Sequence, residues 1–204
     1  MNKPPFLIVN DFLSPLECED IVNRSLFEFP NRDIDGKAIK SVTRNILTQN
    51  RILPYLDDVI DAVEDYFAVE HGGILPLMIE CYPENCKQEG LRAENSVKKD
   101  GKWQRINDHD FTGIIFLKDS STDKNFDDMF EVYGTKLEFP NHQFGFRPQR
   151  GQLIIFPSAP NFVNTTISPK IGDMYQIRFH MVAASPYHYE MNKFPGNYKT
   201  WFST

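Results

Sequence analysis

The chain has 204 residues, of which 41% are hydrophobic and 25% are charged, and its formal net charge is -6 at pH 7. This length can bury one sizeable core and is short for two ordinary domains, so we expect a single globular domain. The acidic balance, with no basic stretch longer than Lys98-Lys99, disfavours binding to nucleic acid or to an anionic membrane.

Cysteine use and the lack of long apolar runs indicate the compartment. Cys18, Cys81 and Cys86 are odd in number and lack the paired spacing of a metal site. No N-terminal apolar run of the signal-peptide type precedes them. No segment approaches the roughly 18 uninterrupted apolar residues of a membrane helix. We therefore expect a soluble protein of a reducing compartment that is not secreted through a signal peptide.

The first third of the chain predicts one strand and two helices. Phe6 to Val9 have the composition of a short strand. Ser14 and Glu17 then have capping-box spacing, which predicts that a helix begins there. A second helix is predicted to begin near Pro54 and to stop at Gly72-Gly73. Its apolar residues recur with the helical period: Leu56, Val59, Ile60, Val63 and Phe67.

From Ile74 onward the pattern changes to short β-type runs bounded by Pro, Gly and Asp. The dipeptide Asp100-Gly101 predicts a projecting hairpin. Helices followed by many strands indicate an α+β chain whose main body is a β-sandwich, with both helices on one face of a sheet. The predicted strands are Leu77 to Tyr82, Phe111 to Leu117, Gly145 to Pro148, Leu153 to Phe156, and Met174 to Val182.

Three segments of the chain form an ordered series: Asp110 to Leu117, Tyr133 to Pro140, and Gly151 to Ser158. In order and spacing they resemble core strands of the iron(II)/2-oxoglutarate oxygenases, prolyl 4-hydroxylase-like branch. The turn and helix start at Phe12 to Cys18 are also similar to the opening of that family. The resemblance implies a double-stranded β-helix, or jelly roll, flanked by N-terminal helices and covering residues 1–185.

The family's iron site maps onto residues of different chemistry. The family binds Fe(II) with a His-x-Asp/Glu pair on one strand and a His on a later strand. By resemblance these fall on Arg92 and Glu94, and on Asn164, or on Thr165 if the loop has lost one residue. Arginine stays protonated and offers no lone pair to a metal. Arg92 would also repel the ion, since two unit charges about 4 Å apart repel by roughly 4 kcal/mol at an effective dielectric near 20.

The cation that pairs with 2-oxoglutarate in that family is also replaced. The corresponding residue here is Met174, whose thioether offers no charge to a buried carboxylate. We therefore expect no cofactor, neither Fe(II) nor 2-oxoglutarate. The resemblance implies a pseudoenzyme with a degenerate site, kept for binding or assembly. The degenerate positions are Arg92, Glu94, Asn164 and Met174.

Several polar residues near these positions have two interpretations. Arg92 and Glu94 fit either an ordinary surface ion pair or a guanidinium that pairs inward with Glu94 where iron would lie. Both interpretations stay open at this point. His109 precedes a predicted strand and is expected to be solvated, and His142 lies in a turn and is expected to be exposed.

One substitute site is compatible with the strand pattern. Arg178 and His180 share a strand face with Met174 if that strand is regular. Arg178 would then take the 2-oxoglutarate carboxylate and His180 a metal. The alternative function is an active Fe(II)/2-oxoglutarate dioxygenase that hydroxylates a protein or small molecule through unusual ligands, such as Glu94 with His180. A nucleic-acid hydroxylase of this fold is disfavoured by the acidic balance.

The tail, residues 186–204, is rich in aromatic residues without helical or strand period. Such an arm either folds back over the barrel or binds a partner, so we expect a protein partner or a homo-oligomer. The Lys, Asn, Asp and Phe content of the loops resembles that of bacteriophage proteins, which gives a cytoplasmic or virion-associated location. The aromatic residues of the tail are Tyr187, Tyr189, Phe194, Tyr198, Trp201 and Phe202.

Overall fold

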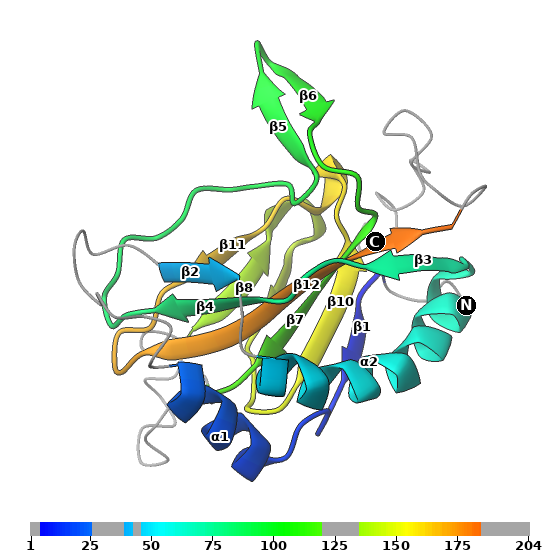
Figure 1. The fold of residues 1–204 in the computed structure, drawn as a ribbon. Coiled ribbons are helices and arrows are strands. Elements are labelled where there is room, and N and C mark those ends of the chain that lie inside the picture. Colours follow the sequence, from blue (N-terminus) through cyan, green and yellow to red (C-terminus); the bar gives the residue numbers. More distant parts are fainter. Residues whose placement is uncertain (1–4, 26–38, 43–45, 120–134, 185–204) are drawn as a thin grey trace.

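The structure is a computed structural model that describes residues 5–25, 39–42, 46–119 and 135–184 (Figure 1). Within these residues the larger sheet has seven strands. They are β1 (Leu7–Val9), β2 (Ile39–Val42), β3 (His71–Ile74), β4 (Met78–Tyr82), β7 (Phe111–Phe116), β10 (Leu153–Pro157) and β12 (Met174–Ala183). Their hydrogen-bonded order is β1-β10-β7-β12-β4-β2, with β3 also paired to β12. The described strand pairs are antiparallel, for example Ile177 opposite Ile115 on β7 and Ile79 on β4.

A smaller sheet lies against one face of the large one. Its order is β11-β8-β9, from β8 (Lys136–Phe139), β9 (Phe144–Phe146) and β11 (Thr165–Ile167). Apolar side chains of both sheets interdigitate between them and bury a common core, which is the jelly-roll arrangement. That core consists mainly of Tyr82, Ile114, Phe116, Leu137, Phe139, Phe146, Ile154, Phe156, Phe162 and Met174. The predicted fold class is thus confirmed.

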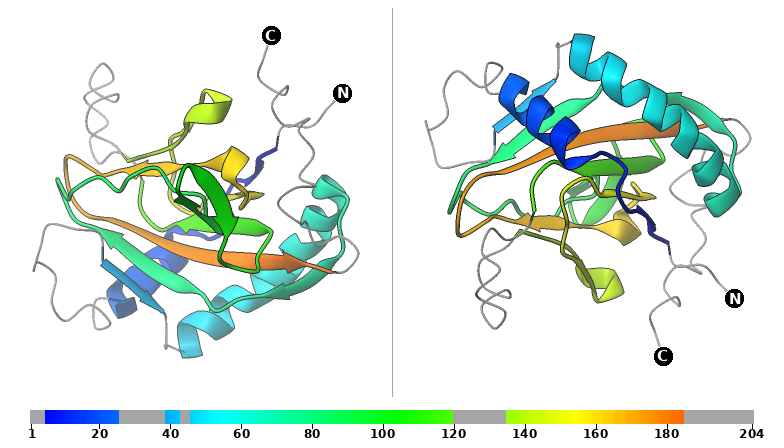
Figure 2. Two further views of the ribbon diagram at one scale, coloured as in Figure 1. Left: turned by 90° about the horizontal axis from the view of Figure 1, so that it is seen from above. Right: turned by 90° about the horizontal axis from the view of Figure 1, so that it is seen from below.

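Two helices cover the opposite face of the large sheet, as the sequence predicts (Figure 2). The helix α1 (Pro15–Ser25) begins with the expected capping box: the Ser14 amide donates to Glu17, and the Glu17 amide donates to the Ser14 hydroxyl. Residues of α1 and α2 (Ile46–Phe67) pack on the strands in a second core. This core includes Ile21, Val22, Ile52, Leu56, Val59, Val63, Ile115, Ile155, Ile177 and Phe179.

The bounds predicted for the second helix were wrong at both ends. The helix α2 begins at Ile46, so Pro54 lies inside it instead of opening it. Proline in a helix interior removes one hydrogen bond and costs about 3 kcal/mol. Complete burial of Ile52, which lies before Pro54 in the same helix, offsets this cost. The helix ends before Ala68, whose φ of 55° is left-handed, and Gly72-Gly73 belong to β3 instead.

The hairpin at Asp100-Gly101 is confirmed. The strands β5 (Ser96–Lys99) and β6 (Lys102–Arg105) pair with Lys99 opposite Lys102. Asp100 and Gly101 have φ of 49° and 78°, as a two-residue type I′ turn requires. This hairpin projects from one end of the sandwich (Figure 1). The predicted tail, residues 186–204, lies outside the described residues, and no helix within the described part is long and apolar enough to cross a membrane.

Candidate functional site

Two adjacent strands of the large sheet place charged side chains inside the sandwich. Gln176 on β12 lies directly opposite Glu80 on β4, and Arg178 follows two residues later on the same face. All three side chains are buried. The Arg178 Nε donates to both Glu80 oxygens at 3.2 Å, and the Gln176 amide donates to Glu80 Oε2 at 2.5 Å. The interior of the sandwich therefore contains a buried ion pair between Arg178 and Glu80.

A short backbone bridge brings two loops to this place. Arg92 and Asn164 exchange amide hydrogen bonds, at 3.0 Å from the Arg92 amide and 2.9 Å from the Asn164 amide. This bridge lies between the end of β4 and the start of β5 on one side, and just before β11 on the other. It fixes Arg92 beside Asn164, although 72 residues of sequence separate them. Glu94 lies there too, because both Arg92 and Asn164 donate a side-chain hydrogen bond to it.

Three donors converge on one oxygen of Glu94. Its Oε1 accepts hydrogen bonds from Arg178 Nη1 at 2.8 Å, from Asn164 Nδ2 at 3.1 Å and from Arg92 Nε at 3.2 Å. Arg92 also pairs with Glu89. The structure thus brings together Arg92, Glu94, Asn164 and Arg178. Of the two interpretations of Arg92 and Glu94, the inward pair is the one observed, with only 6% of the Glu94 side chain exposed.

Electrostatics in this cluster favours the fully charged state. Burial works to raise the pKa of Glu94, but the guanidiniums of Arg178 and Arg92 outweigh it and hold that pKa well below its usual range. Burial works to lower the pKa of Arg178 and Arg92 adds to this, yet Glu80 and Glu94 leave it raised. Glu94, Arg92 and Arg178 therefore form an ion-pair network that stays charged at neutral pH.

Beside this network lie two stacked histidines. The rings of His109 and His180 are 3.9 Å apart at their centroids. His180 Nδ1 is 3.1 Å from the Thr112 hydroxyl, which is itself 2.7 Å from the Ser158 hydroxyl. Burial, with the neighbouring His109, lowers the pKa of His180 to about 3, and burial lowers that of His109. Both rings are neutral at pH 7.

Two expectations about histidines were wrong. His109, expected to be solvated, is 2% exposed because it stacks on His180 and because Asn95 donates to its carbonyl. His142, expected to be exposed, is 4% exposed, since its ring stacks on Phe162 and its Nε2 bonds to the Asn161 carbonyl. In both cases the ring packs against a residue distant in sequence.

Met174 takes no part in the charged network. It is buried in the apolar core between the two sheets, opposite Tyr82 on β4. Arg178 lies four residues further along the same strand face and supplies the cation of the site. Thr165, the other candidate for the distal position, points elsewhere and donates its hydroxyl to the Glu89 carbonyl.

Solved structures show what this architecture is. The viral collagen prolyl hydroxylase of Paramecium bursaria Chlorella virus-1, in its 2OG complex, aligns over 89% of this chain and 97% of that chain, with a TM-score of 0.67 and 13% identity. The chain has the prolyl 4-hydroxylase fold. A Pseudomonas putida prolyl-4-hydroxylase aligns over 90% of this chain and 95% of that chain, with a TM-score of 0.64 and 11% identity. Comparison with protein-family models and with curated protein sequences gives no match.

A third structure supports the same assignment. A prolyl hydroxylase from Trichoplax adhaerens, in complex with a hypoxia inducible factor peptide fragment, aligns over 89% of this chain and 84% of that chain. Its TM-score is 0.61 and its identity is 14%. At such identities the likeness concerns the prolyl 4-hydroxylase fold, and what the site can do must come from its own residues.

The residues that the resemblance assigns to the iron site differ in chemistry from a His-carboxylate-His ligand set. Arg92 offers no lone pair, and Asn164 donates its amide N–H groups to Glu94 and to the Phe162 carbonyl. Glu94 is a suitable ligand type, but its Oε1 already accepts three hydrogen bonds. Among the described residues no group of three or more His, Cys, Asp and Glu side chains is arranged to hold a metal ion.

Two residues of the site escaped sequence reasoning. Glu80 is the lone carboxylate in the apolar strand β4, and Gln176 alternates with Arg178 along β12. A buried carboxylate in such a strand needs a partner of opposite charge. That requirement could have indicated Glu80 as a candidate. Its pairing with Arg178 depends on the register between β4 and β12, which the sequence does not contain.

Proposed function

We propose that this chain is a non-catalytic protein of the prolyl 4-hydroxylase fold that serves a binding or structural role, such as that of a virion component. One observation carries the proposal. The Glu94 carboxylate, the only part of the expected iron site retained, receives two guanidiniums and an amide on one oxygen. Cationic side chains therefore take the place in which the family would hold a cation.

The energetics of this arrangement opposes a metal ion. A divalent cation at Glu94 would lie beside two fixed guanidiniums, each repelling it by several kcal/mol at an effective dielectric near 20. Moving Arg178 away to relieve the repulsion would also strip Glu80 of its buried partner. Breaking such a pair costs about 3–5 kcal/mol because an uncompensated charge is left buried. Binding of iron would thus lower the free energy of unfolding, because it requires the Arg178–Glu80 ion pair to break.

The cosubstrate meets a similar obstacle. Arg178 lies on the same strand face as Met174, the expected position of the cation that pairs with 2-oxoglutarate, but both Glu80 and Glu94 already engage the Arg178 guanidinium. A 2-oxoglutarate carboxylate would have to compete with these two buried carboxylates. At Met174 it would find no charge, and an unpaired buried carboxylate costs several kcal/mol. Such a cost would raise a micromolar dissociation constant beyond millimolar.

Anaerobic calorimetry tests the proposal. Titration of the protein with Mn(II), alone and with 2-oxoglutarate, should give no binding, and neither ligand should raise Tm. Micromolar Mn(II) binding that disappears in Glu94→Ala would overturn the proposal. It would favour the alternative, an active dioxygenase that uses Glu94 with His180, and loss of binding in His180→Ala would then identify the second ligand.

A designed variant tests whether the lost ligands are the reason. Arg92→His, Glu94→Asp and Asn164→His, combined with Arg178→Met and Glu80→Gln to remove the competing cation and its partner, should create Mn(II) affinity. The matched control replaces Thr165 by His in place of Asn164. The control should not bind, because the Thr165 hydroxyl faces the Glu89 carbonyl and not Glu94. Failure of the first variant in a folded state would contradict the assigned ligand positions.

A further inference from the structure

One face of the projecting hairpin has no partner in the described structure. Val97, Lys99, Lys102 and Gln104 point to the same side of the two strands, since residues alternate along each strand. All four are exposed. Lys99 lies directly opposite Lys102, and like charges in that position destabilise a strand pair. We call these four residues the hairpin face.

A complementary surface lies on α2. Asp57, Asp61 and Asp65 are exposed and recur every four residues, so they form one stripe along the helix. Like charges at this spacing destabilise a helix. No ion pair joins any of the three to another residue that the structure describes. We call these three residues the helix stripe.

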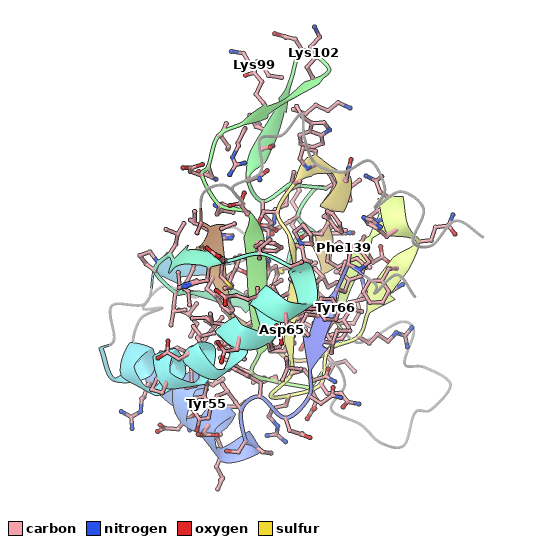
Figure 3. The ribbon with its side chains drawn as sticks, turned by 90° about the vertical axis from the view of Figure 1, so that its right-hand side faces the viewer. Tyr55, Asp65, Tyr66, Lys99, Lys102 and Phe139 are labelled. Carbon is pink, nitrogen blue, oxygen red and sulfur yellow. The ribbon has the colours of Figure 1, made fainter. Side chains whose placement is uncertain are left out.

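The two surfaces cannot meet within one molecule. The hairpin projects from one end of the sandwich, whereas α2 lies along the sheet face remote from the hairpin tip (Figure 1). Figure 3 shows Lys99 and Lys102 at the hairpin tip, far from Asp65 on α2. The lysines of the hairpin face are positively charged and the aspartates of the helix stripe are negatively charged, so the two surfaces attract each other. Contact between them requires two molecules.

We propose that the hairpin face of one copy of this chain docks on the helix stripe of a second copy. This contact rests on the proposed non-catalytic, structural role and names a second copy of the chain as the partner. Exposed Val97, 44% accessible, would supply apolar contact beside the lysines. With a net charge of -6, two copies repel each other over most of their surfaces. The basic hairpin face is therefore a place at which a second, acidic copy is attracted. Since the two surfaces differ, the contact either closes reciprocally in a two-fold dimer or repeats head to tail in a ring or filament.

Sedimentation of the full chain tests the contact at low and high salt. At about 0.01 M salt charges act over roughly 30 Å, and at about 1 M over roughly 3 Å. We expect self-association at low salt that weakens at high salt. The hairpin variant Lys99→Glu, Lys102→Glu and the helix variant Asp61→Lys, Asp65→Lys should each raise the self-association Kd at least about tenfold, which is about 1.4 kcal/mol. The control Lys87→Glu, Lys170→Glu changes net charge by the same amount as the hairpin variant, on exposed lysines elsewhere, and should have no measurable effect.

Mixing the two variants decides the assignment. The reversed hairpin then faces a reversed helix stripe, so the mixture should associate as the natural chain does. A chain that stays monomeric at low salt, or a mixture that fails to associate, would overturn the proposal. So would association that survives both reversals, which would indicate another surface. None of these outcomes bears on the Mn(II) titration, so a failure of the contact and a failure of the non-catalytic role can be told apart.

Discussion

Replacing Arg178 by methionine should destabilise the fold strongly. Methionine keeps much of the volume but removes the guanidinium that lies 3.2 Å from Glu80 and 2.8 Å from Glu94, so that Glu94 keeps only the guanidinium of Arg92. Removing one partner of a buried ion pair costs about 3–5 kcal/mol, and here two carboxylates lose a partner, so we expect about 5 kcal/mol. For a chain of this size that lowers Tm by about 10–20 °C.

Urea denaturation followed by circular dichroism measures this free energy of unfolding. The variant Arg178→Met, Glu80→Gln, Glu94→Gln removes the stranded charges and should recover most of the loss, since apolar or neutral replacements of whole buried networks are often tolerated. Arg24→Met is the control, because Arg24 pairs with Asp20 on the surface and contributes under about 1 kcal/mol. A loss under about 1 kcal/mol in Arg178→Met would refute the reasoning and leave Arg178 available to bind a ligand.

Three further outcomes are expected. Since burial lowers the pKa of His180 from 6.5 to about 3, the unfolded chain binds more protons than the folded chain between these two pH values. The contribution of His180 to stability should therefore be full above pH 6.5 and fall as the pH drops below 6.5. Measurements of Tm against pH will show this fall, which should be less steep in His180→Gln. Gly113→Ala should cost about 1–3 kcal/mol because a Cβ there would overlap the Phe179 ring; an unchanged urea midpoint, equal to that of the control Gly90→Ala where nothing lies nearby, would contradict this packing. Gly101→Ala should cost about 1–2 kcal/mol because its φ is 78°; equal stability would mean that the turn differs from type I′.

Local signals in the sequence predicted local structure well. The capping box at Ser14 and Glu17, the Asp100-Gly101 turn and the strand predicted at Met174 to Val182 each depend on signals within a few residues, and each is found in the structure. The resemblance to the family also singled out Arg92, Glu94 and Asn164, and the side chains of these three residues do contact one another. The start of α2 was missed because burial of Ile52 outweighs the local cost of Pro54.

Interactions that depend on strand register were beyond sequence reasoning. Glu80 meets Arg178 only because β4 pairs with β12 in one register, and His109 is buried only because His180 lies beside it. Neither contact leaves a periodic pattern. The strand β3, next to the end of α2, was missed as well, because Gly72-Gly73 are typical of a helix stop and not of a strand.

The shared use of Glu94 makes an iron site hard to introduce at this place one substitution at a time. Arg92, Asn164 and Arg178 all donate to the same oxygen, and Arg92 and Arg178 each bind a further carboxylate, Glu89 and Glu80. Exchanging Arg92 alone for histidine would leave Glu89 without its partner, while Arg178 would still repel a metal. On the non-catalytic role that we propose, Arg92→His on its own therefore loses stability before it gains a ligand, and the network opposes the stepwise introduction of an iron site.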